Sequence, residues 1–224
     1  QYIMKKLKIL LLLFCLASSY LQAQVHIYAG PGFGKLRYFQ GPAQTRAFNF
    51  NNLTDVEEEM DPNQNFNGYV IGTSLYAGIF NFGLEWNTKH NSYSGTRTNG
   101  ISVERKQQMN SFYVNFGMGN KVEDDKPKKI IYRIQAAWGG MSYFLKEKIQ
   151  GTTDDSDGVL DKAKSQGTVR GSVSVLIPIY KKFSINVVPY YEIMDSDGYV
   201  HLTTIDHYYN ITNYGVNLNL DYEF

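Results

Sequence analysis

The end of the chain alternates between apolar and polar residues with a period of two. From position 214 onward one parity carries Tyr214, Val216, Leu218, Leu220, Tyr222 and Phe224, and the other carries Gly215, Asn217, Asn219, Asp221 and Glu223. Because successive side chains of a strand point to opposite faces, this pattern predicts a β-strand with one apolar face. That face begins and ends in aromatic residues, which is typical of the interfacial girdles of membrane barrels.

The same alternation recurs in six earlier segments. Their apolar parities run over 69–77, 82–86, 112–118, 132–138, 169–179 and 183–193. A further, less regular strand is expected from position 25 to about 39, where Gly30, Gly32 and Gly34 alternate as close packing in a narrow barrel would require. The pattern therefore predicts eight strands, with the glycine-rich first strand pairing with the last.

The connections between these strands alternate in length. Long polar segments follow the odd-numbered strands, at 40–65, 93–107, 146–166 and 195–210, and short ones follow the even-numbered strands, at 79–81, 120–128 and 180–182. Outer-membrane barrels have long external loops and short periplasmic turns. We therefore predict an all-β, eight-stranded antiparallel transmembrane up-and-down β-barrel. A soluble eight-stranded barrel is the alternative, but it offers no reason for sorting its loops. We expect no second domain, and no segment shows a helical periodicity of useful length.

The first 23 residues are expected to lie outside the barrel. We interpret Met4 as the translation start and residues 1–3 as a gene-calling extension. Three lysines precede an apolar run at 9–17, and Ala23 supplies a small residue at a cleavage site, so we predict a signal peptide over 1–23. The apolar run is shorter than the roughly 20 residues of a spanning helix. The predicted barrel then covers 24–224 and lies in the cell outer membrane.

Composition agrees with a lipid-facing barrel. The chain has 18 Tyr, 13 Phe and 20 Gly but 6 Pro, and its mean hydropathy is −0.35. A barrel can be this polar because only every second residue must face lipid. The single cysteine, Cys15, falls in the predicted leader, so we expect neither disulfides nor a cysteine metal site. The three lysines of the predicted leader account for the net positive charge of the chain. The rest of the chain has no excess of basic residues, so nothing indicates nucleic-acid binding. No cofactor is expected.

Three segments resemble the small outer-membrane barrels of the OmpA/OmpX-like superfamily, and more narrowly the outer membrane beta-barrel proteins of Bacteroidota. They are Ala23-Gln24, the opening 25–34 and the terminal 218–224. The resemblance covers 24–224. It implies contact with outer-membrane lipid and lipopolysaccharide, and it implies that the barrel-assembly machinery reads the last strand through Val216, Leu218, Leu220, Tyr222 and Phe224. Members of this superfamily have many functions, so the resemblance is specific for the fold alone.

Five charged residues fall on inward phases of different predicted strands: Glu85, Arg133, Arg170, Glu192 and Asp221. An eight-stranded barrel is just wide enough for side chains to fill it. Because unpaired buried charges are costly, we predict an ion-paired plug in the lumen. A narrow small-solute pore is the alternative.

Two acidic turns are candidates for calcium. They contain Asp155 and Asp157, and Asp195 and Asp197. Neither turn has the full spacing or the distal glutamate of an EF-hand loop. Asp, Ser and Gly are also common turn residues, so we favour solvated turns and predict no metal site.

One constellation is typical of an enzyme: His90, Ser92 and Glu104. Base, nucleophile and orienting acid are what acyl transfer needs. The triple resembles the His-x-Ser…Glu arrangement of the outer-membrane lipid A deacylases, but Asn91 and residues 93–95 do not match that family, and the triple lies on early strands. A polar strand end is the simpler interpretation. We predict no enzyme, with this hydrolase as the alternative.

The leading hypothesis is a non-enzymatic barrel with a structural, docking or accessory role. Such a role would depend on the external loops or on the lipid-facing wall. The first loop, 40–65, contains Glu57, Glu58 and Glu59 and is long enough to fold over the mouth or to meet a partner. By resemblance, membership of a larger outer-membrane secretion or assembly complex is included in this hypothesis.

Overall fold

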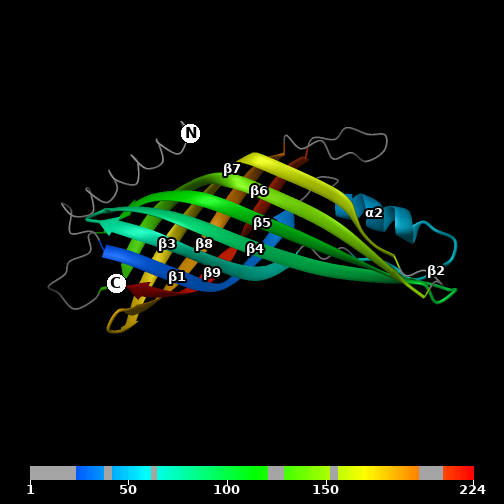
Figure 1. Ribbon diagram of the computed structural model, residues 1–224, viewed down its shortest axis with the longest axis horizontal. Coiled ribbons are helices and arrows are strands. Elements are labelled where there is room, and N and C mark those ends of the chain that lie inside the picture. Colours follow the sequence, from blue (N-terminus) through cyan, green and yellow to red (C-terminus); the bar gives the residue numbers. More distant parts are fainter. Residues whose placement is uncertain (1–23, 38–41, 62–64, 121–128, 152–155, 197–208) are drawn as a thin grey trace, which may run out of the picture.

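The computed structural model describes residues 24–37, 42–61, 65–120, 129–151, 156–196 and 209–224. The elements in chain order are β1 (Gln24–Arg37), α2 (Pro42–Asn51), β2 (Val56–Glu58), β3 (Asn65–Ala77), β4 (Phe80–Arg97), β5 (Ser102–Gly119), β6 (Ile131–Gln150), β7 (Ser156–Tyr180), β8 (Phe183–Ser196) and β9 (Tyr209–Glu223). Figure 1 shows the long strands wound around a common axis.

Eight of the strands close into an antiparallel barrel, as the alternation predicted. Each strand pairs with its sequence neighbours, and β1 pairs with β3 on one side and β9 on the other. In this β1–β9 seam, which was also predicted, Gly34 lies opposite Gly215. A Cβ built on Gly215 would lie 1.9 Å from the Phe33 carbonyl oxygen, so this close approach requires glycine. The short β2 adds to β4 beyond the closed part.

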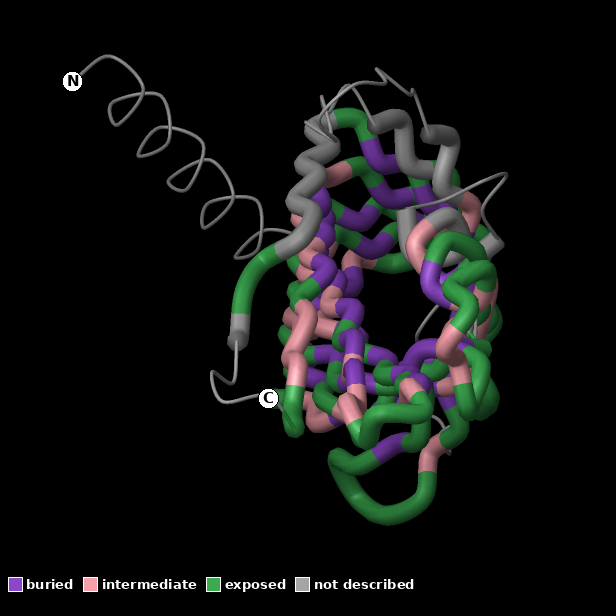
Figure 2. The backbone as a smooth tube through the Cα atoms, turned by 90° about the vertical axis from the view of Figure 1, so that its right-hand side faces the viewer, coloured by how far each residue is buried: buried purple, intermediate pink, exposed green. Residues whose placement is uncertain are grey.

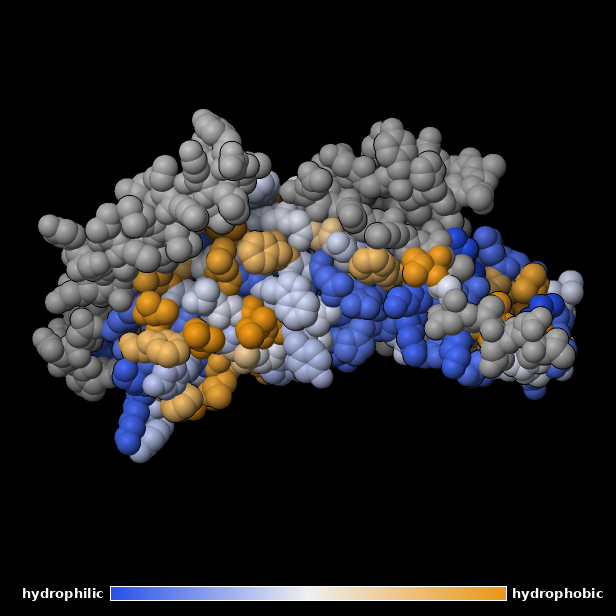
Figure 3. Space-filling view, in the orientation of Figure 1, coloured by the Kyte–Doolittle hydropathy of each residue, from blue (hydrophilic) through white to orange (hydrophobic). Residues whose placement is uncertain are grey.

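The two faces of the wall have opposite polarity. Buried and more exposed positions alternate along the eight barrel strands wherever burial is described, as Figure 2 shows in purple and green. The exposed positions near the short turns are apolar, and orange residues gather on this part of the wall in Figure 3. Aromatic residues border this apolar belt at both edges: Tyr69, Trp86, Phe112, Trp138 and Tyr191 toward the long connections, and Phe80, Phe116, Tyr132, Tyr180, Phe183 and Phe224 toward the short turns. This is the surface of a transmembrane barrel.

Two of the short connections are tight turns. Residues 78–79 join β3 to β4 and residues 181–182 join β7 to β8. Gly78 and Lys181 adopt φ values of 62° and 47°, the left-handed conformation that two-residue hairpin turns favour. Most of the third predicted short connection, 120–128, lies outside the described residues.

Four consecutive strands continue well beyond the belt. β4 and β5 have 18 residues each, β6 has 20 and β7 has 25, whereas β1, β3, β8 and β9 have 13 to 15. A transmembrane strand needs only about 9 to 11 residues. The additional segments, 88–97, 102–110, 140–150 and 156–167, form a sheet that we call the blade; it extends to the right in Figure 1.

The blade corrects two predictions. Segments 93–107 and 146–166 were expected to be loops, but most of each is strand. The connection between β4 and β5 is only 98–101. The physical reason is that outward residues become polar where a sheet leaves the lipid, so polarity here marks the change of surroundings and not the end of the strand.

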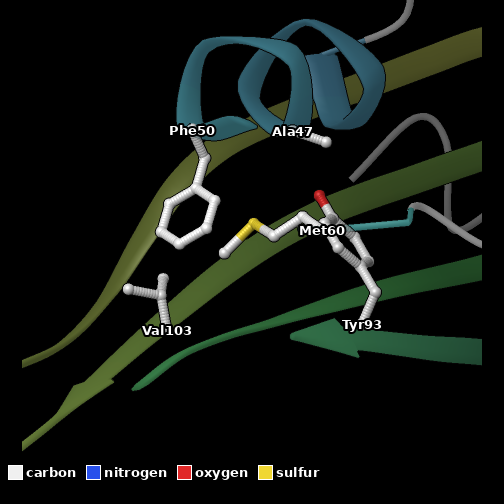
Figure 4. Close-up of a cluster of buried hydrophobic side chains, with 5 residues drawn as sticks. All are labelled: Ala47, Phe50, Met60, Tyr93 and Val103. Carbon is white, nitrogen blue, oxygen red and sulfur yellow. The ribbon is translucent and has the colours of Figure 1, made fainter. Parts of the chain in front are cut away.

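A helix, which was not expected, packs against the inner face of the blade. Ala47 and Phe50 of α2 lie together with Met60, Tyr93 and Val103 in a buried apolar cluster (Figure 4). Asn51, at the end of α2, holds the backbone of Met60 beside the helix. Its side chain donates to the Met60 carbonyl at 3.0 Å and accepts from the Met60 amide at 2.8 Å. Burial raises the pKa of the Tyr93 hydroxyl to about 12, so this group stays neutral in the cluster.

Other inward side chains at the external level are apolar as well. Leu36, Phe66, Met109, Met141 and Leu145 are buried on the inward parity of β1, β3, β5 and β6. Polar side chains are buried at the same level, among them Asn91, Arg105 and Gln107, so the interior above the belt mixes apolar and polar groups. Across the described part of the chain, none of the helices combines the length and apolarity that a membrane span demands.

Removing the Phe50 ring should release α2 from the blade. Phe50 is 6% exposed, whereas Phe48 of the same helix is 66% exposed. Truncating a buried Phe costs about 3–5 kcal/mol. This exceeds the free energy that keeps a locally packed segment from opening. Phe50→Ala should therefore speed hydrogen exchange of the helix amides at least tenfold, while Phe48→Ala leaves it unchanged. Equal exchange in both variants would contradict the packing.

Candidate functional site

The centre of the lumen is an ion pair between Glu85 of β4 and Arg170 of β7. Both side chains are buried, at 4% and 2% exposure, and an Arg170 Nη1 hydrogen bonds to Glu85 Oε1. The other carboxylate oxygen accepts from the Tyr28 hydroxyl at 3.0 Å, and Arg170 Nη2 donates to Asn115 Oδ1 at 3.0 Å. Because β5 and β6 lie between β4 and β7 in the sheet, the pair crosses the bore of the barrel.

Tyrosine rings extend this pair along the lumen. Arg170 Cζ lies 4.4 Å from the Tyr113 ring centroid and 5.9 Å from that of Tyr190. Lys89 Nζ lies 4.1 Å from the Tyr190 centroid and donates to the Tyr190 hydroxyl. Cation–π contacts of this kind gain strength where water is excluded. One connected polar network thus links β4, β5, β7 and β8.

Glu192 of β8 lies directly opposite Arg170 of β7 in the sheet. It is buried, and its Oε2 accepts from Asn213 Nδ2 at 2.6 Å. Among the described residues its other oxygen, Oε1, has no hydrogen-bond partner and no ion pair. Glu192 is therefore held by the Asn213 amide.

A second group of charges lies nearer the short turns. His26 Nδ1 lies 2.5 Å from Asp221 Oδ1, and the His26 ring meets the Tyr76 ring edge-on at 4.3 Å. Arg133 Cζ lies 4.0 Å above the Tyr76 ring centroid. Arg133 and Asp221 do not form an ion pair, and among the described residues the Arg133 guanidinium nitrogens have no hydrogen-bond partner.

All five predicted lumen charges are inside the barrel, but only Glu85 and Arg170 pair with each other. Sequence reasoning missed Lys89 and His26, together with the tyrosines that hold the cations. Lys89 shares the parity of Glu85 and could have been found by continuing the alternation past Asn87. His26 could have been found from the parity of the less regular β1. The tyrosines carried no signal, because Tyr is common on both faces of the barrel.

The hydrolase alternative fails on register. His90 and Ser92 are both exposed on the outer face of β4, but His90 pairs with Gln108, and Glu104 pairs with Ser94. Glu104 is thus displaced by four residues from His90, about 13 Å along the strand. It instead forms an ion pair with Lys106, with 3.4 Å between Oε1 and Nζ. An orienting acid must hydrogen bond to the histidine, so these residues do not form a catalytic relay.

The calcium candidates are only partly visible. Asp155 and Asp197 lie outside the described residues, and Asp157 and Asp195 lie in β7 and β8. Within the described ranges, no group of three or more His, Cys, Asp or Glu residues could hold a metal ion. The calcium alternative stays a prediction.

The terminal strand has the expected orientation. Its apolar parity, Val216 to Phe224, faces outward, and the Phe224 amide donates to the Val25 carbonyl at 2.9 Å across the seam. The Tyr222 and Phe224 rings meet edge-on at 5.0 Å. Recognition of this strand by the barrel-assembly machinery stays a prediction.

Comparisons with known proteins give structural likenesses only. No protein-family model matches the chain, and no curated protein matches it. Among solved structures it is similar to the attachment invasion locus protein Ail of Yersinia pestis, with a TM-score of 0.46, 8% identity, and 89% of this chain and 99% of that one covered. It is also similar to Neisserial surface protein A (TM-score 0.43, 9% identity, 90% and 99% covered). A third is the outer membrane protein OprG of Pseudomonas aeruginosa (0.44, 7%, 90% and 96%).

These likenesses are weak, and no functional argument rests on them. The barrel follows from the strand pairing and the surface polarity of this chain itself.

Breaking the Glu85–Arg170 pair on one side should destabilise the barrel. Removing one partner of a buried pair leaves an uncompensated charge and costs about 3–5 kcal/mol. Glu85→Gln should lower the urea midpoint of the chain folded in lipid vesicles, measured by the loss of heat-modifiable gel mobility. The double variant Glu85→Gln/Arg170→Met should recover much of this loss.

The matched control is Glu104→Gln, which removes a partly exposed carboxylate on the neighbouring strand. Exposed pairs contribute about 0–1 kcal/mol, so this variant should unfold near the wild-type midpoint. If Glu85→Gln were as stable as Glu104→Gln, the pair would not organise the lumen.

Proposed function

We propose that this protein is an integral outer-membrane barrel with a filled lumen, which presents its blade outside the cell as a docking surface within a larger assembly. The observation that carries the proposal is the combination of a membrane-height apolar belt with a sheet that continues beyond it and has its own buried core. A barrel whose function required only the membrane-spanning wall would not need four strands that extend beyond the membrane.

The height of the belt supports the membrane location. On β7, β8 and β9 the outward parity stays largely apolar over 169–179, 183–193 and 214–224. Eleven residues per strand is the length that a tilted transmembrane strand requires. The predicted leader supports export, and closed barrels are the form in which strands cross a membrane.

The lumen argues against a pore. The narrow bore of an eight-stranded barrel is filled by side chains. Here the Glu85–Arg170 pair crosses it, Lys89 and Tyr190 meet in it, and further buried side chains such as Gln107 and Leu145 follow. An ion that passed through would have to break a desolvated salt bridge, which opposes conduction.

The surface of the blade supports docking. On its outer face Lys106 of β5 lies directly opposite Lys146 of β6 and forms an ion pair with Glu104, so the blade presents exposed charges of both signs. The segment that carries α2 and β2 adds exposed carboxylates at Glu57, Glu59 and Asp61. Charges of both signs, presented by a rigid sheet, favour an oriented protein partner.

The edge of β7 supports docking as well. Residues 156–166 pair with β6, but β8 begins to pair with β7 only at Gly167. Among the described residues no strand pairs with that stretch on the side away from β6. Such an edge is a template for an extended segment of another chain.

A photo-crosslinking amino acid should test the docking role in intact cells. Placed at Lys106, whose side chain is 60% exposed on the blade, it should give a discrete higher-mass protein adduct. Placed at Ile134, which is 71% exposed in the belt, it should give none, because lipid surrounds that position. Absence of adducts at Lys106, and purification of the chain alone in mild detergent, would refute the docking role.

Conductance separates the docking role from a pore. In planar bilayers the purified chain should give no current steps, since its lumen is filled within the membrane. A variant lacking residues 42–61 should be equally silent, because α2 covers the blade and not the ion pair. Steps in the wild type would restore the pore alternative, and steps only in the truncated variant would make α2 the plug.

A further inference from the structure

A groove of about 670 Å³ lies on the outer wall, where β9, β1, β3 and β4 leave the apolar belt. Strand register explains its lining. Phe33 of β1 is opposite Val216 of β9 and Asn67 of β3, and Asn67 is opposite His90 of β4. These outward side chains form the row of the groove nearest to the belt.

A second row lies one step farther from the belt. Lys35 of β1 is its centre and is opposite Tyr214 on one side and Asn65 on the other. Ser92 of β4 completes this row, and the backbone at Gly34 and Gly215 contributes to the lining. The groove is therefore built from four strands of the rigid wall and not from a loop.

The donors of the groove are suited to an anion. The lining contains the Lys35 ammonium, the His90 ring, the Ser92 hydroxyl and side-chain amides, but no carboxylate. Lys35 is exposed and takes part in no ion pair among the described residues. An ammonium group beside further donors favours phosphate, whose oxygens accept hydrogen bonds from ammonium, imidazole, hydroxyl and amide groups alike.

The position of the groove specifies the rest of the ligand. Toward the short turns it opens onto Phe33 and Val216 and then onto the belt residues Tyr69 and Leu218, all on the outer face. A ligand seated there has its charged part at the level of lipid headgroups and its remainder against a wall made for acyl chains. A soluble anion would use the donors but not this apolar continuation.

We propose that this groove binds the phosphate-bearing headgroup of an outer-leaflet lipid, with Lys35 as its charge partner, His90 and Asn67 as hydrogen-bond donors, and Phe33 and Val216 under the first carbons of an acyl chain. This rests on the membrane location in the proposed function, but not on the docking role of the blade. His90 and Ser92, which do not form a catalytic relay, thereby gain a role as lipid contacts.

Native mass spectrometry of the full folded chain can test the groove. The protein is released from micelles that contain equal amounts of phosphatidic acid and a diacylglycerol with the same chains. The wild type should retain one phosphatidic acid and little diacylglycerol. Lys35→Ala should reduce retention about tenfold, the effect of losing one charge-assisted hydrogen bond, and Lys35→Arg should keep most of it. His90→Ala should give a smaller loss.

The matched control is Lys106→Ala, which removes an exposed lysine from the blade above the groove and should retain lipid as the wild type does. Equal retention by Lys35→Ala and Lys106→Ala would overturn the site. Displacement of the lipid by millimolar inorganic phosphate alone would also overturn it, because the groove would then take free anions.

Heat-modifiable gel mobility of each variant, measured after insertion into phosphatidylcholine vesicles, keeps the two proposals apart. A chain that does not insert contradicts the membrane location itself. A chain that inserts and folds, yet retains both lipids equally, contradicts only the groove.

Discussion

Backbone N–H and C=O groups in hydrocarbon have no water to bond to, so each must find its partner within the protein. In this chain the seam between β1 and β9 meets that requirement, because without it both strands would be open edges in lipid. The glycine pair at Gly34 and Gly215 allows the seam to close tightly, and the bond from the Phe224 amide to Val25 secures its end. Closure then dictates the rest: one parity faces lipid, and the other is confined to a narrow interior.

That confinement explains how the interior is filled. At the level of the belt the inward side chains are polar, so charges such as Glu85 and Arg170 must find each other across the bore. Above the belt the outer face is in water, and the inward parity carries a mixed core: Met109 and Leu145 are buried there with Gln107, and α2 packs against the sheet. The outer face is what changes along these strands, from apolar at the belt to polar where the sheet leaves the membrane.

The alternation made the strand count and the seam predictable, and parity alone put Glu85 and Arg170 in the lumen. It could not say that these two would pair, because partners across the bore depend on how the whole barrel is sheared. The blade was missed because outward Ser94, Glu104 and Lys106 were interpreted as loop polarity. Helix α2 was missed because it is one short segment whose stability comes from packing on a sheet that had not been predicted. The outer groove depends on neighbours from four strands, and no local pattern contains it.

The blade rises from β4 to β7 only, while β8, β9, β1 and β3 end close to the belt. The height of the sheet above the membrane therefore differs around the barrel. The protein has a tall half and a low half, unlike a plain cylinder. A neighbour in the plane of the membrane can reach the belt over the low half without meeting the sheet, whereas on the tall half it meets the sheet first. The groove lies where the two halves join, beside β4. Among the described elements the blade flanks a molecule bound there on one side only, so the sheet restricts approach from that side.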